Sequence, residues 1–159
     1  MWQNLIETLD KLGEVYDNLA VLGEKKRAAL INVDMKNLSA ILDEEKIRLT
    51  EIQKLEQQRI ELFKDLSKSN TGEPPTAENF YRTAPSHVLE KKLFESHKRL
   101  VENVQRALKI RDDNQVLAQC ASDAAQMKLN KIGGATVEQT YSDKGSGIVT
   151  HQKNFDFMA

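Results

Sequence analysis

The segment from Asp34 to Leu66 places an apolar residue at every third, fourth or seventh position, with charged and amide side chains between them. The apolar positions are Leu38, Leu42, Leu49, Ile52, Leu55, Leu62 and Leu66. Two polar residues, Glu45 and Arg59, occupy steps of the same stripe. This spacing predicts an α-helix with one apolar side, roughly 50 Å long at about 1.5 Å per residue. A helix of this length cannot bury its stripe alone, so other parts of the chain must pack against it.

Two more segments show helical spacing, and the sequence therefore predicts an all-α fold. The expected architecture is an elongated antiparallel bundle, or coiled coil, of three long helices. The helices are expected at about residues 2–31, 35–66 and 86–132, with a proline-containing loop at 67–85. Together they form one predicted domain, residues 1–133.

Two glycines, Gly13 and Gly23, interrupt the first predicted helix. Each is about 1 kcal/mol less favourable than alanine in a helix interior. One interpretation, which propensity alone favours, is that packing outweighs this cost. The other is that the missing side chains allow the backbone of a neighbouring helix to approach closely.

The connection between the first two helices is short. Residues 32–34 separate them, which predicts an antiparallel helical hairpin. The alternative is one continuous helix through this point, because none of the three residues is proline or glycine. Asp34 is expected to cap the start of the second helix, because its carboxylate can accept backbone N–H groups that a helix start leaves unpaired. Ser86 is expected to cap the third helix in the same way.

The loop between the second and third helices contains all three prolines of the chain, within residues 67–85. Proline lacks the N–H that a helix interior needs, so this window ends one helix and delays the next. Residues 76–82 can form one or two helical turns there, with Thr76 as the cap. Phe80 and Tyr81 are expected to pack the loop against the end of the bundle.

The third predicted helix has no breaker before Gly133. At about 1.5 Å per residue it approaches 70 Å, some 20 Å longer than either of the others. If it runs back along the second helix, its last four or so turns project past the 32–34 turn without a partner in the chain. Its stripe is Leu89, Leu93, Leu100, Val104 and Leu108, followed by Val116, Leu117, Cys120, Ala121, Ala124 and Met127.

The projecting part of this helix carries little charge, since Asp123 is the only charged residue between Asp113 and Lys128. Small side chains and methionine on such a face can accept another helix and repack around several of them. We therefore expect a partner-binding surface here; the alternatives are that it closes a homodimer or folds over the chain's own core. The residues expected to form the surface are Val116, Leu117, Cys120, Ala121, Ala124 and Met127.

Residues 134–159 are predicted to be a flexible tail, because aliphatic residues are few and glycines recur among polar ones. The tail holds Tyr141, Phe155 and Phe157. Aromatic residues in such a tail often mark a short docking motif. The alternative is that they pack on the bundle or pair as short strands through residues 148–150.

Composition argues against several classes of partner. Charged residues make up 30% of the chain but sum to a net charge of −1, so no concentrated basic surface for nucleic acid or an anionic membrane is expected. No apolar run approaches the roughly 18 residues that a membrane span needs, and the first ten residues have no basic leader. The sequence therefore predicts a cytoplasmic protein without membrane insertion.

No catalytic, cofactor or metal site is predicted. The three histidines have no glutamate three residues before them, as a di-iron bundle requires, and the glycines form no phosphate-binding loop. Cys120 lies on an apolar face and is expected to be a small core residue rather than a nucleophile. His87 and His97 fall on the charged side of the last helix and are expected to be solvated. We therefore predict that the chain is not an enzyme.

Residue groups in three places, the hairpin, the last helix and the segment after it, carry a family resemblance. In the hairpin they are Glu24-Lys25-Lys26, Ala28-Ala29-Leu30, Glu44-Glu45-Lys46 and Leu55-Glu56-Gln57-Gln58-Arg59; in the last helix, Asn114 and Val116-Leu117; and after it, Thr140-Tyr141-Ser142-Asp143-Lys144-Gly145. The last group is similar to a threonine/leucine–tyrosine–x–x–x–glycine motif. In this order the three groups resemble the FlgN-type flagellar export chaperones over most of the chain.

The resemblance implies a helical, ATP-independent chaperone. It would bind the C-terminal helical region of hook-associated proteins of the hook–filament junction and keep it from assembling or being degraded before export. The family's client-binding surface lies in the last helix, which corresponds here to residues 116–127. The tyrosine after that helix is implicated in docking to the cytosolic domain of the export gate and corresponds to Tyr141.

The tail beyond Gly145 departs from the often basic, serine-rich tail of the family. No role is therefore carried over to Phe155 and Phe157. The alternative to a chaperone is a self-associating structural coiled-coil protein without a client, in which the projecting helix end pairs with a second copy.

Overall fold

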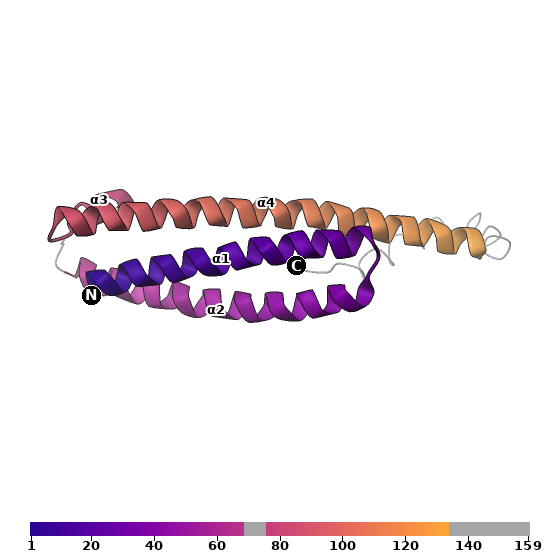
Figure 1. Ribbon diagram of the computed structural model, residues 1–159, viewed down its shortest axis with the longest axis horizontal. Helices are drawn as coiled ribbons and strands as arrows, with labels where there is room; N and C mark the ends of the chain where they lie inside the picture. Colours follow the sequence, from indigo (N-terminus) through magenta and orange to yellow (C-terminus); the bar gives the residue numbers. More distant parts are fainter. Residues whose placement is uncertain (69–75, 134–159) are drawn as a thin grey trace, which may run out of the picture.

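The computed structural model describes residues 1–68 and 76–133 of the chain (Figure 1). These residues form helices and no strand, which confirms the all-α class. The helices are α1 (Trp2–Ile31), α2 (Met35–Ser67), α3 (Ala77–Tyr81) and α4 (His87–Ile132). The limits of the three long helices differ from the expected ones by at most one residue. The short α3 confirms the helical turns expected within residues 76–82, so the described residues form four helices rather than three long ones alone. The predicted tail, residues 134–159, lies outside the described residues.

Three of the four described helices, α2, α3 and α4, begin at a capping side chain. At three helix starts a side-chain oxygen accepts a hydrogen bond from a backbone N–H of the first turn, which the helix itself leaves unpaired. The caps are Asp34 (3.1 Å), Thr76 (3.3 Å) and Ser86 (3.3 Å). At the other end of α4, the N–H of Gly133 donates to the carbonyl of Leu129 at 2.9 Å.

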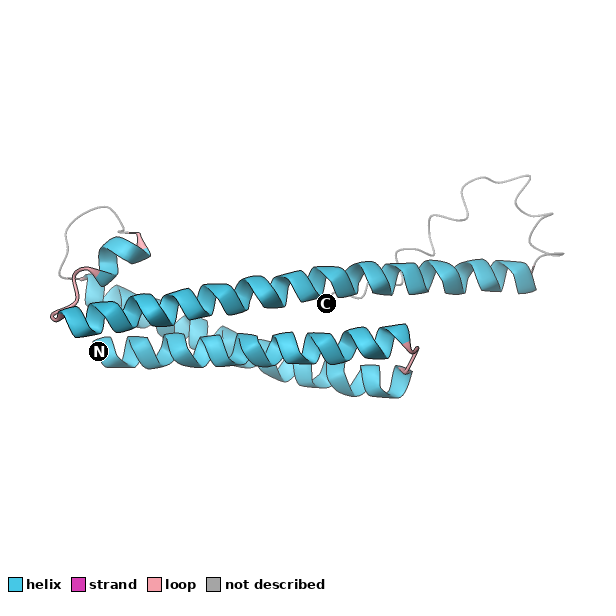
Figure 2. Cartoon of the chain, turned by 45° about the horizontal axis from the view of Figure 1, so that its top comes forward, coloured by secondary structure: helices cyan, strands magenta, loops and turns pink. Residues whose placement is uncertain are grey.

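α1 is the central helix of the bundle (Figures 1 and 2). The turn at residues 32–34 folds α2 back antiparallel to α1, which confirms the predicted hairpin. α4 runs parallel to α1. Both α2 and α4 pack mainly against α1 rather than against each other. The expectation that the last helix runs back along α2 therefore needs correction, since its main partner is α1.

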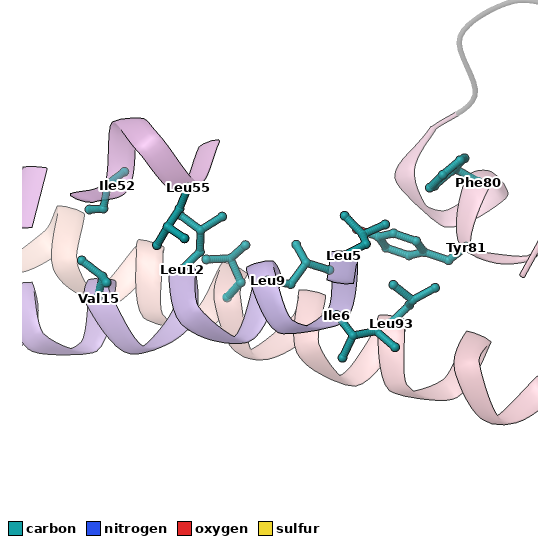
Figure 3. Packing of buried hydrophobic residues seen from close by; sticks show 11 residues of the cluster. Leu5, Ile6, Leu9, Leu12, Val15, Ile52, Leu55, Phe80, Tyr81 and Leu93 are labelled. Carbon is teal, nitrogen blue, oxygen red and sulfur yellow. The ribbon is translucent and has the colours of Figure 1, made fainter. Parts of the chain in front are cut away.

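The apolar core surrounds the N-terminal half of α1 (Figure 3). Its buried side chains come from all four helices: Leu5, Ile6, Leu9, Leu12, Val15, Ile52, Leu55, Phe80, Tyr81, Leu93 and Leu100. α2 buries less than its stripe predicts, because it packs along one long neighbour that covers only a narrow strip. In consequence Leu49 is 46% exposed, although the stripe includes it.

The two polar residues of the α2 stripe are paired. Glu45 accepts a hydrogen bond from the Lys26 ammonium of α1 at 3.1 Å, and both side chains are largely buried. Arg59 pairs with Glu56 of α2 at 2.8 Å. Burying a charge is unfavourable unless it is paired. At Glu45 an ion pair between α1 and α2 thus replaces an apolar contact.

The aromatic residues of α3 hold the loop against the bundle end, as predicted. Phe80 is fully buried, with its ring centroid 5.1 Å from that of Trp2 and 4.2 Å from that of Phe63. The Tyr81 hydroxyl lies 3.1 Å from Nδ1 of His97 on α4. The expectation that His97 is solvated is therefore wrong, because it is half-buried and hydrogen-bonded to α3.

Both glycines of α1 lie where α4 approaches closely. A Cβ atom on Gly13 would be 3.9 Å from the α4 backbone, and one on Gly23 would be 2.5 Å from Cγ2 of Ile110. The two glycine carbonyls also accept hydrogen bonds from α4, from Asn103 at 2.9 Å and from Asn114 at 2.8 Å. The close-approach interpretation therefore holds at Gly23, where a side chain would clash with Ile110. At Gly13 a methyl group would make ordinary contacts, which agrees with the interpretation that packing tolerates the glycine.

We expect Gly23→Ala to lower the free energy of unfolding and Gly13→Ala to leave it unchanged or raise it. At position 23 the new methyl group meets a rigid β-branched side chain, and overpacking destabilises by about 1–3 kcal/mol, against about 1 kcal/mol gained in helix propensity. At position 13 the nearest atoms are 3.8–4.0 Å away, so the propensity gain dominates. Urea unfolding followed by circular dichroism measures both variants.

Ile110→Ala supplies the control for this clash. In that background Gly23→Ala should destabilise less, because the atom it meets has been removed. Equal losses in both backgrounds would contradict the close contact between α1 and α4.

His97 makes the stability of the fold depend on pH. Burial lowers the pKa of His97 below its ordinary value of 6.5, the charge of Arg59 lowers it further, and Glu78 opposes the shift. The unfolded chain therefore binds more protons than the folded chain once the pH falls below 6.5. The stabilisation from neutral His97 is present above this value and is lost as the pH falls toward the folded pKa.

We accordingly expect the wild-type chain to lose more free energy of unfolding than His97→Gln between about pH 7.5 and about pH 5.5. A glutamine can keep a hydrogen bond to Tyr81 but does not titrate. Urea unfolding at each pH measures the difference. His87→Gln, at an exposed position, should follow the wild type; the full wild-type slope in His97→Gln would contradict this role.

Candidate functional site

α4 lies along α1 in a constant register. The polar contacts between the two helices join residues 89, 90 or 91 positions apart: Arg106 with Asp17, Asn103 with Gly13, and Asn114 with Gly23. Parallel helices keep such an offset when they rise together residue by residue. Ile31, the last residue of α1, is therefore level with about residue 121 of α4.

Beyond this level α4 continues without α1 beside it (Figures 1 and 2). We call residues 122–132 the projecting segment. It extends about three turns, or roughly 16 Å, past the end of α1, rather than the four or so turns expected from the sequence. Within the described part of the chain nothing covers it, and all its residues from 123 onward are exposed.

The six predicted partner-binding residues do not share one side of α4. All are exposed except Leu117, which is half-buried: Val116, Cys120, Ala121, Ala124 and Met127. At about 100° per residue, Ala121 lies on the side that faces α1, whereas Val116 and Met127 lie on the opposite side. The expectation that Cys120 is a small core residue is wrong, because the structure shows its side chain exposed.

The side of α4 that faces α1 continues through residues that the sequence stripe missed: Ala125, Leu129 and Ile132. Leu129 lies about ten turns after the buried Leu93, and Ile132 about five turns after the buried Asn114, so they fall on the same line. Because α1 has ended, Leu129 is 64% and Ile132 80% exposed. Extending the 3.6-residue period from the buried residues would have identified them.

Asn114 is the last buried polar contact before the projecting segment. Its Nδ2 donates to the carbonyl of Gly23 at 2.8 Å, and only 3% of the residue is exposed. Its Oδ1 has no hydrogen-bond partner among the described residues. A shift of α4 along α1 would leave the amide donor buried and unpaired, which is unfavourable by about 1–3 kcal/mol. Asn114 thus helps to determine how far α4 projects.

The projecting segment offers a surface for noncovalent binding. An uncovered apolar helix side of small and aliphatic residues can bury the apolar side of another helix. Within residues 1–68 and 76–133, no three His, Cys, Asp or Glu side chains are placed to hold a metal ion. None of the described helices is both long and apolar enough to cross a membrane.

Comparison with protein families adds the decisive observation. The family model described as FlgN protein matches residues 1–147, which include every described helix and the projecting segment. The chain belongs to the FlgN family. FlgN proteins are flagellar export chaperones, so the resemblance read from the hairpin and the last helix is confirmed. No curated protein and no solved structure matches the chain.

The FlgN match also extends over Tyr141, for which the resemblance implies a docking role. This residue lies outside the described residues, as do Phe155 and Phe157. Their roles stay predictions, as does the division of the chain into a domain and a tail.

Proposed function

We propose that this FlgN chain is a cytosolic chaperone of flagellar type III export. It binds the C-terminal helical region of hook-associated proteins at the end of α4, prevents their premature assembly or degradation, and delivers them to the export gate. The observation that carries the proposal is the projecting segment, three turns of helix with an uncovered apolar side, in a chain of the flagellar export chaperone family.

Burial of apolar surface supplies the driving force. Each fully buried leucine, isoleucine or methionine side chain contributes about 1.5–3 kcal/mol, and the exposed Met127, Leu129 and Ile132 are available for this purpose. α4 is already helical, so the client loses most of the conformational freedom on binding. A client helix covered in this way cannot use the same apolar side for assembly.

Charged substitutions in the predicted surface should weaken client binding without unfolding the bundle. We expect Ala121→Glu and Ala124→Glu to weaken binding of a peptide from the C-terminal helical region of a hook-associated protein by at least about tenfold. The reason is that a carboxylate would have to lose its water to fit under the client helix. Isothermal titration calorimetry measures the affinity, and urea unfolding verifies the fold.

Ala40→Glu is the matched control, because Ala40 is an exposed alanine of α2 outside the predicted surface. This variant should bind like the wild type. Full binding by Ala121→Glu and Ala124→Glu would remove the end of α4 as the client site.

Delivery to the export gate is assigned to Tyr141 on the family resemblance. We expect Tyr141→Ala to weaken binding of the gate's cytosolic domain by about thirtyfold, as removal of an anchoring aromatic residue does, and to leave client affinity unchanged. Biolayer interferometry with the client-loaded chain measures the first quantity. Phe155→Ala is the control, and unaltered gate binding by Tyr141→Ala would contradict the assignment.

The alternative, a self-associating coiled-coil protein, uses the same exposed end of α4. Sedimentation equilibrium separates the two functions. A chaperone is expected to be a monomer, or a dimer that the client peptide displaces. A dimer that survives dilution and is unaffected by the peptide supports the alternative instead.

A further inference from the structure

The hairpin turn between α1 and α2 contains a valine in a backbone conformation that is unfavourable for valine. α1 ends with the N–H of Val33 donating to the Leu30 carbonyl at 3.3 Å and that of Asp34 donating to the Ala29 carbonyl at 2.9 Å. In this arrangement the residue between Asn32 and Asp34 has a left-handed backbone conformation, and this position is usually occupied by glycine or asparagine. Here it is Val33, with φ 53°, where a β-branched residue is an outlier. Its side chain is 71% exposed, so packing within the described residues does not explain it.

Val33 has apolar neighbours at the same tip. Ile31 is 61% and Met35 65% exposed. The register of α4 on α1 places this tip level with about residues 121–125, where the projecting segment begins. The tip therefore ends level with the start of the α1-facing side of the projecting segment. We call this combined surface the shelf: Ile31, Val33, Met35, Ala125, Leu129 and Ile132.

Resting on the proposed function, we infer that the shelf is where the client helix docks. The client helix abuts the hairpin tip and continues the path of α1 along α4. The shelf is continuous with the interface between α1 and α4, and it presents the same side of α4 that α1 covers earlier. A helix seated there repeats the packing of α1 and covers the apolar side chains of the tip as well.

Charge indicates which kind of helix fits. Where α1 is present, Arg99 and Arg106 pair with Asp10 and Asp17 along one edge of α4. The same edge continues in the projecting segment with Lys128 and Lys131. At about 100° per residue, Lys128 lies within about 20° of Arg99 and Lys131 within about 20° of Arg106. Neither lysine has an ion-pair partner among the described residues. The client helix is therefore an amphipathic one, with an apolar side flanked by carboxylates on the edge that faces these lysines.

Val33→Gly tests the shelf with two readouts of opposite sign. Glycine relieves the left-handed conformation and should raise the melting temperature by about 2–4 °C. The loss of the valine side chain should weaken binding of the hook-associated protein peptide by about tenfold. A misfolded variant cannot give both results. A raised melting temperature with unchanged affinity would overturn the inference.

A pair of isoleucines supplies the matched comparison. Ile31→Ala should weaken peptide binding, whereas Ile47→Ala, at a 63% exposed position on α2, should not. Replacing both Lys128 and Lys131 with glutamate in the wild-type chain should also weaken peptide binding. A peptide with its flanking carboxylates replaced by lysine should restore it. Equal effects of the two isoleucine variants, or no rescue, would contradict the shelf.

The outcomes distinguish this inference from the proposed function. If the wild-type chain does not bind the peptide, the proposed function fails. If the peptide binds and Ala124→Glu prevents binding while Val33→Gly and Ile31→Ala do not, the function stands and the shelf fails. If Val33→Gly and Ile31→Ala instead dissociate a dimer of the chain without changing peptide affinity, the shelf joins two copies and the inference is overturned.

Discussion

α4 lies close to α1 at the levels of Gly13 and Gly23, and at Gly23 it can do so only because the glycine has no side chain. At these two levels the amides of Asn103 and Asn114 reach the glycine carbonyls at 2.9 and 2.8 Å. Hydrogen bonds at two levels determine both the separation and the register of the helices, because a shift would leave buried polar groups unpaired. The register in turn determines where α4 leaves the bundle, and so the length of α4 that α1 leaves uncovered.

The ends of the helices could be predicted from the sequence because their causes are local. A capping side chain acts within one turn, so Asp34, Thr76 and Ser86 mark helix starts whatever helix packs beside them. The anchoring of α3 was equally predictable. Phe80 and Tyr81 are large apolar residues within a polar, proline-containing window, and their burial requires contact with the bundle.

The buried sides of the helices could not be predicted as well, because they depend on the neighbour. Asn114 and His97 look like solvated residues in sequence, yet their partners, the Gly23 carbonyl and the Tyr81 hydroxyl, lie on other helices. At the end of α4 the difficulty is different. Alanines occur on several sides of this helix and contribute almost no periodic signal. The predicted surface was therefore based on Val116 and Met127 and did not include Leu129 and Ile132.

An isolated helix as short as the projecting segment is marginal in water, because nucleation is unfavourable. The segment is not isolated, since it prolongs a helix whose nucleation is already stabilised along α1, and each added residue gains a backbone hydrogen bond. Its alanines also have the highest helix propensity. It can therefore keep its shape without a covering partner and present a preformed apolar side. The difference in length between α1 and α4 thus leaves an apolar helix side uncovered at the end of α4, and a longer hairpin would cover it.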